Sequence, residues 1–100
     1  MKYDHMLPIG SLVKVEEEDR RVVIIGTNVV DEATGRIFDY TGVFYPVGYT
    51  GPDNVGSFNH EDIEIIYSVG YQDEESLGFQ EYAEATNAEA RGSAAGGRNE

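Results

Sequence analysis

The middle of the chain alternates aromatic and apolar residues with polar ones, and this pattern constrains the fold more than any other feature. Residues 35–48 read GRIFDYTGVFYPVG, and residues 57–67 read SFNHEDIEIIY. Alternation with a period of two is typical of β-strands that bury one face. We therefore expect this part of the chain to form a compact β core with a binding edge rather than an active site.

Two earlier segments also predict strands. Residues 11–15 (SLVKV) alternate, and residues 16–19 (EEED) fit a charged hairpin tip. Residues 20–26 (RRVVIIG) contain four consecutive β-branched residues, which indicates a central strand covered on both faces or a strand that crosses a barrel corner. A glycine inside such a pattern marks a bend or a bulge, and we expect one at Gly26.

The aromatic segment is expected to continue the sheet. Residues 36–46 predict one long strand, or two strands that pivot at Gly42. Phe38 and Phe44 are expected in the core of the domain. Residues 47–56 contain three glycines and one proline, so we expect a loop there.

The C-terminal part predicts a helical turn, a strand and a helix. Residues 58–62 fit a turn capped by Ser57 or Asn59, and residues 63–69 return to strand. Asp73 is expected to cap the helix, and the first half of the helix is expected to dock on the sheet through an apolar stripe. The stripe consists of Leu77, Phe79, Tyr82, Ala83 and Thr86.

These elements predict a mainly β (α+β) fold. We expect a small rolled antiparallel sheet or an SH3-like barrel of about five strands with a C-terminal helix. A chain of 100 residues is expected to form one domain. Residues 1–86 would form this β-rich domain with its helix, and residues 87–100 would be a fading helix end with a disordered tail of glycine, alanine and serine.

The composition excludes several kinds of chemistry and partner. The chain has no cysteine, which rules out disulfides, thiol catalysis and cysteine-bound metal sites, and fits a reducing cytoplasm. The net charge of −12 makes nucleic acid a poor partner and a basic protein surface a better one. Acidity could equally serve only to keep a cytosolic protein soluble. No apolar run approaches the roughly 18 residues that cross a bilayer, so we expect no membrane insertion.

The sequence carries no strong catalytic or metal-binding motif. Neither of the two histidines belongs to a nucleophile motif, and an enzyme would need Asp39, Asp62 or His60 to converge in one pocket. The loop residues Asp53 and Asn54 lack the alternating acids of a calcium loop. We therefore predict a protein that is not an enzyme and that uses no cofactor and no metal.

The best candidates for binding follow the long aromatic strand. Tyr45 and Tyr49 lie near Pro46 and the glycine-rich loop, and Asp53 and Asn54 belong to the same loop. A tyrosine that packs its ring and keeps its hydroxyl in water is typical of protein interfaces. We predict that Tyr45, Tyr49, Asp53 and Asn54 contact a partner protein, and that an edge strand there can pair with a strand of the partner.

Five short segments carry a family resemblance. They are residues 7–11 (LPIGS), 23–26 (VIIG), 38–48 (FDYTGVFYPVG), 58–63 (FNHEDI) and 70–75 (GYQDEE). In this order they resemble a family of small proteins from Gram-positive Firmicutes that carry only a domain-of-unknown-function label, and the resemblance covers residues 7–82. Members are often encoded near type VII (ESX-like) secretion genes and their LXG-type toxins. The resemblance implies an accessory role and assigns no catalytic residue.

Two roles fit this resemblance. The first is a cytoplasmic, non-enzymatic adaptor or chaperone that binds an LXG-type toxin or a secretion component. The second is an immunity protein that neutralises a cognate LXG-type toxin with its acidic surface. Residues 71–75 also match the export pattern Tyr-x-x-x-Asp/Glu, but the usual Trp-x-Gly hairpin is impossible because the chain has no tryptophan. The identity of the partner and the oligomeric state stay open.

Overall fold

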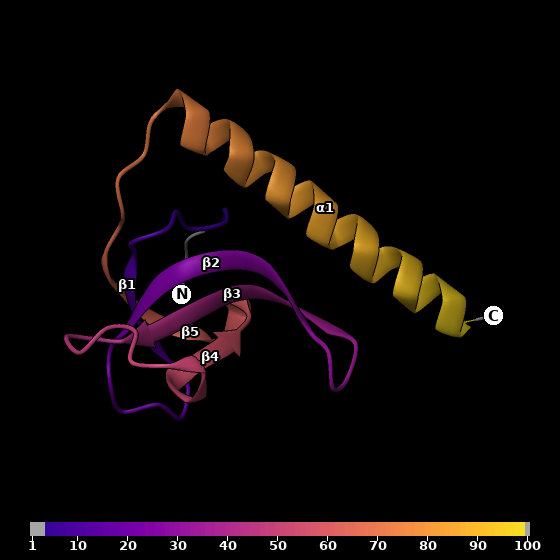
Figure 1. The fold of residues 1–100 in the computed structure, drawn as a ribbon. Coiled ribbons are helices and arrows are strands. Elements are labelled where there is room, and N and C mark those ends of the chain that lie inside the picture. Colours follow the sequence, from indigo (N-terminus) through magenta and orange to yellow (C-terminus); the bar gives the residue numbers. More distant parts are fainter. Residues whose placement is uncertain (1–3, 100) are drawn as a thin grey trace.

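The computed structural model describes residues 4–99, with side chains up to residue 90. Its strands are β1 (Leu12–Val15), β2 (Val22–Asp31), β3 (Arg36–Phe44), β4 (Val55–Phe58) and β5 (Ile63–Ser68). Two short 3-10 helices, η1 (Pro52–Asn54) and η2 (His60–Asp62), flank β4, and a long helix, α1 (Glu74–Asn99), follows β5. Figure 1 shows α1 running diagonally above the long curved strands β2 and β3.

The five strands form one antiparallel sheet in the order β4-β3-β2-β1-β5. Because β5 pairs with β1, the last strand of the chain returns to lie beside the first. The predicted class, a mainly β domain with a five-stranded antiparallel sheet and one C-terminal helix, is confirmed. The same order leaves β4 and β5 at the two edges of the sheet.

A bulge interrupts the central strand β2 where the sequence predicts one. Ile24 pairs with Gly42 and Gly26 pairs with Thr41, so Ile25 is an extra residue in β2. A Cβ on Gly26 would lie 2.8 Å from Thr41 Cγ2, so a side chain there would press on β3. Ile24 is buried and Ile25 is exposed, so this strand is only partly covered on its second face.

The core lies on the inward face of the sheet, and Tyr40 is its largest fully buried side chain. The other members of the buried cluster are Met6, Leu7, Val13, Val22, Ile24, Phe58, Ile63 and Ala83. Phe44 packs against this cluster and is itself partly exposed. Phe38, which the sequence placed in the core, lies outside the cluster, and the Arg36 guanidinium covers its ring at 5.2 Å. Tyr40 takes the central place because it pairs with Phe58 of β4, and their ring centroids lie 5.5 Å apart.

One cross-strand ion pair joins β1 and β5. Lys14 Nζ lies 2.8 Å from Glu64 Oε1, and this hydrogen bond raises the pKa of Lys14 above its usual value. The raised pKa means that any stability from this pair is present at neutral pH and is lost as the pH rises through that pKa. Because the pair is exposed to solvent, its contribution is small.

Helix α1 begins where the sequence predicts and docks through a different face. Its cap is confirmed, because Asp73 Oδ1 accepts a hydrogen bond from Ser76 N at 2.9 Å. The predicted apolar stripe is wrong in most of its members, since Leu77, Phe79 and Tyr82 are exposed and Thr86 is only partly buried. The buried face instead consists of Gln80, Ala83 and Asn87.

Polar contacts therefore hold α1 on the sheet. Asn28 Nδ2 donates to the Ala83 carbonyl at 3.2 Å, and Asn87 Nδ2 donates to Asp39 Oδ1 at 2.8 Å. These partners come from β2 and β3, far away in the sequence. A side chain that finds its polar partner only in the folded chain gives no periodic apolar signal, which is why the sequence pattern missed this face.

The helix is also longer than the sequence indicates. Its backbone continues to Asn99, whereas the sequence predicts fading from Asn87. The predicted disordered tail falls mostly on residues 91–100, whose side chains lie outside the described part of the chain. The division into a domain at residues 1–86 and a tail at residues 87–100 therefore stays a prediction.

Substitution of Gly70 tests the packing of the N-terminal segment on the end of β5. A Cβ at this position would collide with the Ile9 carbonyl oxygen, so we expect Gly70→Ala to lower the free energy of unfolding by about 1–3 kcal/mol. Gly78→Ala is the matched control, because Gly78 lies in α1 and its added Cβ would meet no atom within 4 Å beyond the local backbone of the helix. It should raise that free energy by about 0.5–1 kcal/mol. Urea unfolding measures both, and equal effects would contradict the packing described.

Candidate functional site

The four residues predicted to contact a partner lie on the β3–β4 loop, which we define as residues 45–54. Tyr45 is 41% exposed and Tyr49 is 63% exposed. Asp53 and Asn54 are exposed in η1, on the same loop. The structure therefore presents all four residues to solvent, and the loop adds a further exposed apolar side chain, Val47.

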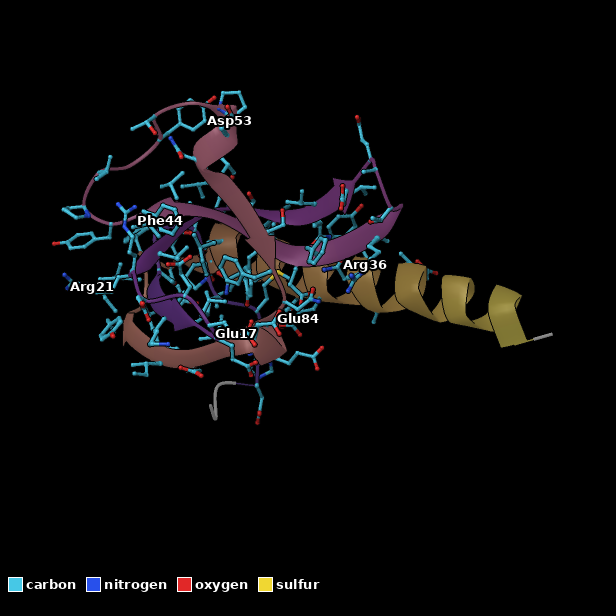
Figure 2. The ribbon with its side chains drawn as sticks, turned by 90° about the horizontal axis from the view of Figure 1, so that it is seen from below. Glu17, Arg21, Arg36, Phe44, Asp53 and Glu84 are labelled. Carbon is cyan, nitrogen blue, oxygen red and sulfur yellow. The ribbon has the colours of Figure 1, made fainter. Side chains whose placement is uncertain are left out.

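Two consecutive arginines brace the start of this loop. The Arg20 guanidinium carbon lies 4.3 Å from the centroid of the Phe44 ring, and the Arg21 guanidinium carbon lies 4.7 Å from the centroid of the Tyr45 ring. Tyr45 N also donates to the Arg21 carbonyl at 2.8 Å. Cation–π contacts of this kind contribute about 0.5–1 kcal/mol each at exposed sites. Figure 2 shows Arg21 and Phe44 at the same end of the sheet.

Turn contacts fix the rest of the loop. Gly48 N donates to the Phe44 carbonyl at 2.8 Å, with Gly48 at a φ of 83° that favours glycine. Asn54 Nδ2 donates to Thr50 Oγ1 in the second half of the loop. Asn54 therefore supports the loop as well as facing solvent. These contacts give the loop a defined conformation, and the loop carries two exposed tyrosines.

A second cluster of polar side chains lies around Asp39 and Tyr40 of β3. Tyr40 Oη accepts a hydrogen bond from Leu7 N at 2.8 Å and lies 2.7 Å from His60 Nδ1. His60 N donates to Asp39 Oδ2 at 2.8 Å, and Asn87 Nδ2 donates to the other carboxylate oxygen. Tyr40 and Asp39 are adjacent in β3, and both are buried.

This cluster opens to the surface in a shallow pocket of about 240 Å³. Asp39, Tyr40 and His60 line it, together with Glu84 and Asn87 from α1. Two of the residues that an enzyme would need to bring together, Asp39 and His60, thus share one pocket. Asp62 does not line that pocket, and its carboxylate accepts a hydrogen bond from Asn59 N at 3.0 Å within the capped turn of η2.

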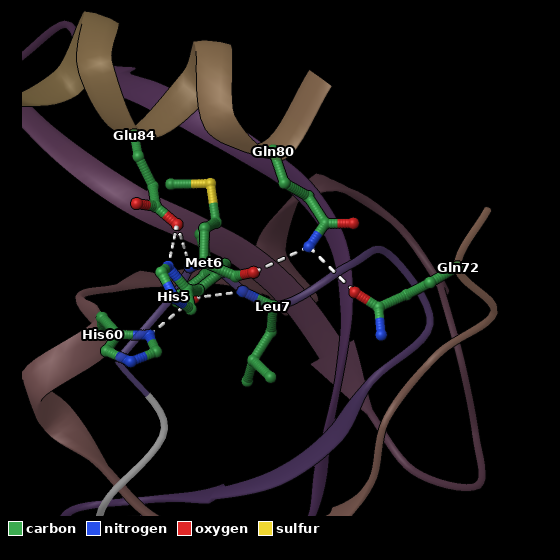
Figure 3. A network of polar contacts seen from close by, with 8 residues as sticks. His5, Met6, Leu7, His60, Gln72, Gln80 and Glu84 are labelled. Atoms are coloured by element: carbon green, nitrogen blue, oxygen red, sulfur yellow. Dashed lines mark hydrogen bonds and ion pairs between the residues drawn. The ribbon is translucent and has the colours of Figure 1, made fainter. Parts of the chain in front are cut away.

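The hydrogen bonds of the cluster connect four separate parts of the chain. Both oxygens of Asp39 and the hydroxyl of Tyr40 bond groups from the N-terminal segment, η2 and α1. Figure 3 shows the neighbouring contacts that hold the N-terminal segment under α1, where Glu84 accepts from Met6 N and Gln80 Nε2 donates to the Met6 carbonyl at 2.9 Å. The cluster therefore acts as a polar junction of the fold.

Sequence patterns did not identify this junction, although a weak signal for it exists. Adjacent residues of a strand point to opposite faces, so a half-buried strand would leave either Asp39 or Tyr40 in water. Both are buried because Tyr40 packs in the core, while the carboxylate of Asp39 bonds His60 N of η2 and Asn87 of α1. In the sequence, the one indication that both faces of β3 are covered is Asp39, an acid inside a strand of aromatic residues.

Among the described residues, no three histidine or acidic side chains are grouped closely enough to hold a metal ion. Within the same part of the chain, no helix is both long and apolar enough to cross a membrane.

Removing the Tyr40 hydroxyl tests the polar junction. Tyr40→Phe leaves the buried Leu7 N–H without its acceptor, so we expect the free energy of unfolding to fall by about 1–3 kcal/mol. Tyr67→Phe is the control, because Tyr67 is exposed on β5, and it should change that free energy by less than about 0.5 kcal/mol. Chemical unfolding followed by circular dichroism distinguishes the two, and a Tyr40→Phe protein as stable as the parent would rule out the junction.

Comparison with known proteins gives one match. A family model described as Domain of unknown function (DUF4176) matches residues 6–79, which include all five strands and the first turns of α1. No curated protein and no solved structure matches the chain. The match covers about three quarters of the chain and includes all five segments that carry the family resemblance. The chain therefore belongs to the DUF4176 family.

Proposed function

We propose that this protein is a cytoplasmic, non-enzymatic binding accessory, an adaptor or chaperone, that serves a type VII secretion locus. The observation that carries the proposal is the exposure of Tyr45 and Tyr49 on one braced loop. Tyrosine is enriched at protein interfaces, where its ring supplies contact area and its hydroxyl bonds polar groups of the partner. Two such rings beside the exposed Val47 form a small docking surface.

The bracing of the loop supports this role. Binding costs free energy when loops and side chains must become ordered, and a loop already fixed in shape avoids part of that cost. The Arg21–Tyr45 contact and the hydrogen bond between Gly48 and Phe44 hold the base of the loop. The surface can therefore present its aromatic side chains without a large rearrangement.

The charge of the chain indicates what the partner surface is like. A net charge of −12 favours association with a basic protein surface, because complementary potentials speed the encounter of two proteins. The link to type VII secretion rests on the resemblance to proteins that are encoded near secretion genes and LXG-type toxins. An LXG-type toxin or another secretion component is accordingly the proposed partner.

An immunity protein is the alternative, and the acidity of the chain is the observation that favours it. With 19 acidic and 7 basic residues, the chain could cover a basic toxin cleft. Coexpression separates the two roles. An immunity protein should restore growth to cells that make the cognate toxin, whereas an adaptor should increase the amount of toxin secreted without protecting the cells. Binding by a charged plug should also weaken as salt is added.

Loss of the Tyr49 ring tests the proposed docking surface. We expect Tyr49→Ala to reduce recovery of the partner in affinity purification from the native host, because the ring is exposed on the loop. Its free energy of unfolding should stay within about 0.5 kcal/mol of the parent, as for other surface changes. Tyr71→Ala is the matched control, since Tyr71 is 81% exposed and lies outside the loop. Equal recovery with both variants would refute the loop as the docking surface.

A further inference from the structure

Gly56, which faces Gly42 across β3 and β4, leaves a gap in the inward face of the sheet. Gly42 pairs directly with Gly56, and directly paired residues of antiparallel strands share one face. A Cβ on Gly42 would lie 2.5 Å from Val22 Cγ1 and 3.3 Å from Phe58 Cε1, so this face is the one that meets the core. A Cβ on Gly56 would meet no atom within 4 Å. The space beside Gly56 is therefore open.

This space is a pocket of about 250 Å³, which we name the glycine pocket. Its apolar walls include Val15, Val22, Phe44 and Phe58. Its remaining side is formed by three consecutive glutamates, residues 16–18, from the turn between β1 and β2. The pocket thus combines an apolar interior with a negatively charged rim.

We infer that the glycine pocket receives a lysine or arginine side chain from an extended segment of the partner, an inference that rests on the proposed function. Pockets for drug-sized ligands span about 300–1,000 Å³, so the smaller volume here suits a single side chain. Lysine and arginine bury their methylene stems against apolar surface while their charged ends stay at a polar rim. The methylene stem of such a side chain matches the apolar interior of the pocket, and its charged end matches the glutamate rim.

The position of the pocket favours an extended partner segment. β4 lies at the edge of the sheet, and an edge strand can pair with a strand from another protein. A segment paired with β4 would run beside Gly56, and every second side chain would point toward the inward face. The β3–β4 loop leads directly into β4, so one partner could contact the loop and the pocket together.

The local contacts indicate which acids would meet the cation. Glu18 already accepts a hydrogen bond from Arg20 N at 3.1 Å, whereas Glu16 and Glu17 are exposed at the rim. The Arg20 guanidinium packs against the Phe44 ring but does not line the glycine pocket, so it leaves the glutamate rim free of an internal cation. We therefore assign the charged end of the partner side chain to Glu16 and Glu17.

Two peptides test the preference for a cation. The isotopically labelled full chain is titrated by NMR with a short capped peptide that has lysine between two valines, and with the same peptide carrying norleucine instead. We expect the lysine peptide to shift the amide signals of Gly42, Gly56 and Phe58, and the norleucine peptide to bind about tenfold more weakly because it lacks the charge. Equal affinities, or no shift of these signals by either peptide, would overturn the inference.

Two variants test the rim and the interior of the pocket separately. Replacing Glu16 and Glu17 by glutamine should weaken binding of the lysine peptide about tenfold, because the rim loses two charges. The control replaces Glu81 and Glu89, which are exposed on α1, and should leave the affinity within about twofold. An equal loss in both variants would show only a general charge effect and would overturn the assignment of the rim.

Gly56→Val should fill the pocket. The position has room for a Cβ, and valine is favourable in a strand, so the variant should fold. It should no longer bind the lysine peptide. Retained binding by folded Gly56→Val would overturn the inference. That result would leave the proposed function standing as long as partner recovery still depends on Tyr49, because the loop would then act without the pocket.

Discussion

The rest of the structure depends on the burial of the Tyr40 side chain in the inward face of β3. Its ring packs on Phe58 of β4, and its hydroxyl accepts the N–H of Leu7 and bonds His60. A buried hydroxyl must be satisfied inside the protein, so the N-terminal segment and η2 are brought to one place. Asp39, the next residue back along β3, does the same for α1 through Asn87. Two adjacent residues thus fix the arrangement of four segments.

The register that places Tyr40 opposite Phe58 also creates the features at the other end of β3. Two residues further along, Gly42 faces Gly56, and the absence of a side chain at Gly56 leaves the pocket beside the acidic turn open. Two residues further again, Phe44 ends β3 just before the β3–β4 loop, and its ring packs against the Arg20 guanidinium. The core and the pocket are therefore consequences of one strand pairing, whereas the position of Phe44 at the base of the loop follows from its pairing with Val22 of β2. A shift of that pairing by one residue would turn every one of these side chains to the other face.

Local signals in the sequence predicted much of the fold. A glycine within a run of β-branched residues predicted the bulge at Gly26, and a capping acid before two glutamates predicted the start of α1 after Asp73. The exposure of Tyr45 and Tyr49 agreed with their place in a glycine-rich loop. Each of these signals depends on neighbours in the chain, which a sequence displays directly.

Features that depend on distant residues could not be predicted in the same way. The choice of Tyr40 over Phe38 for the core follows from pairing with β4, and the polar face of α1 follows from partners such as Asn28. The pocket requires Gly42 and Gly56 to be paired, and their separation in sequence gives no indication of this register. Apolar periodicity describes one helix or strand at a time and gives no information about which residues of different elements pair.

Site-specific photocrosslinking in the native host tests the central claim most directly, namely that another protein docks at the end of the sheet where the β3–β4 loop lies. A photoreactive residue is placed at Tyr49 in one variant and at Tyr71, which is exposed elsewhere, in a second. We predict a defined protein adduct from position 49, identified by mass spectrometry, and no such adduct from position 71. The same adduct from both positions, or an adduct from position 71 alone, would contradict the account.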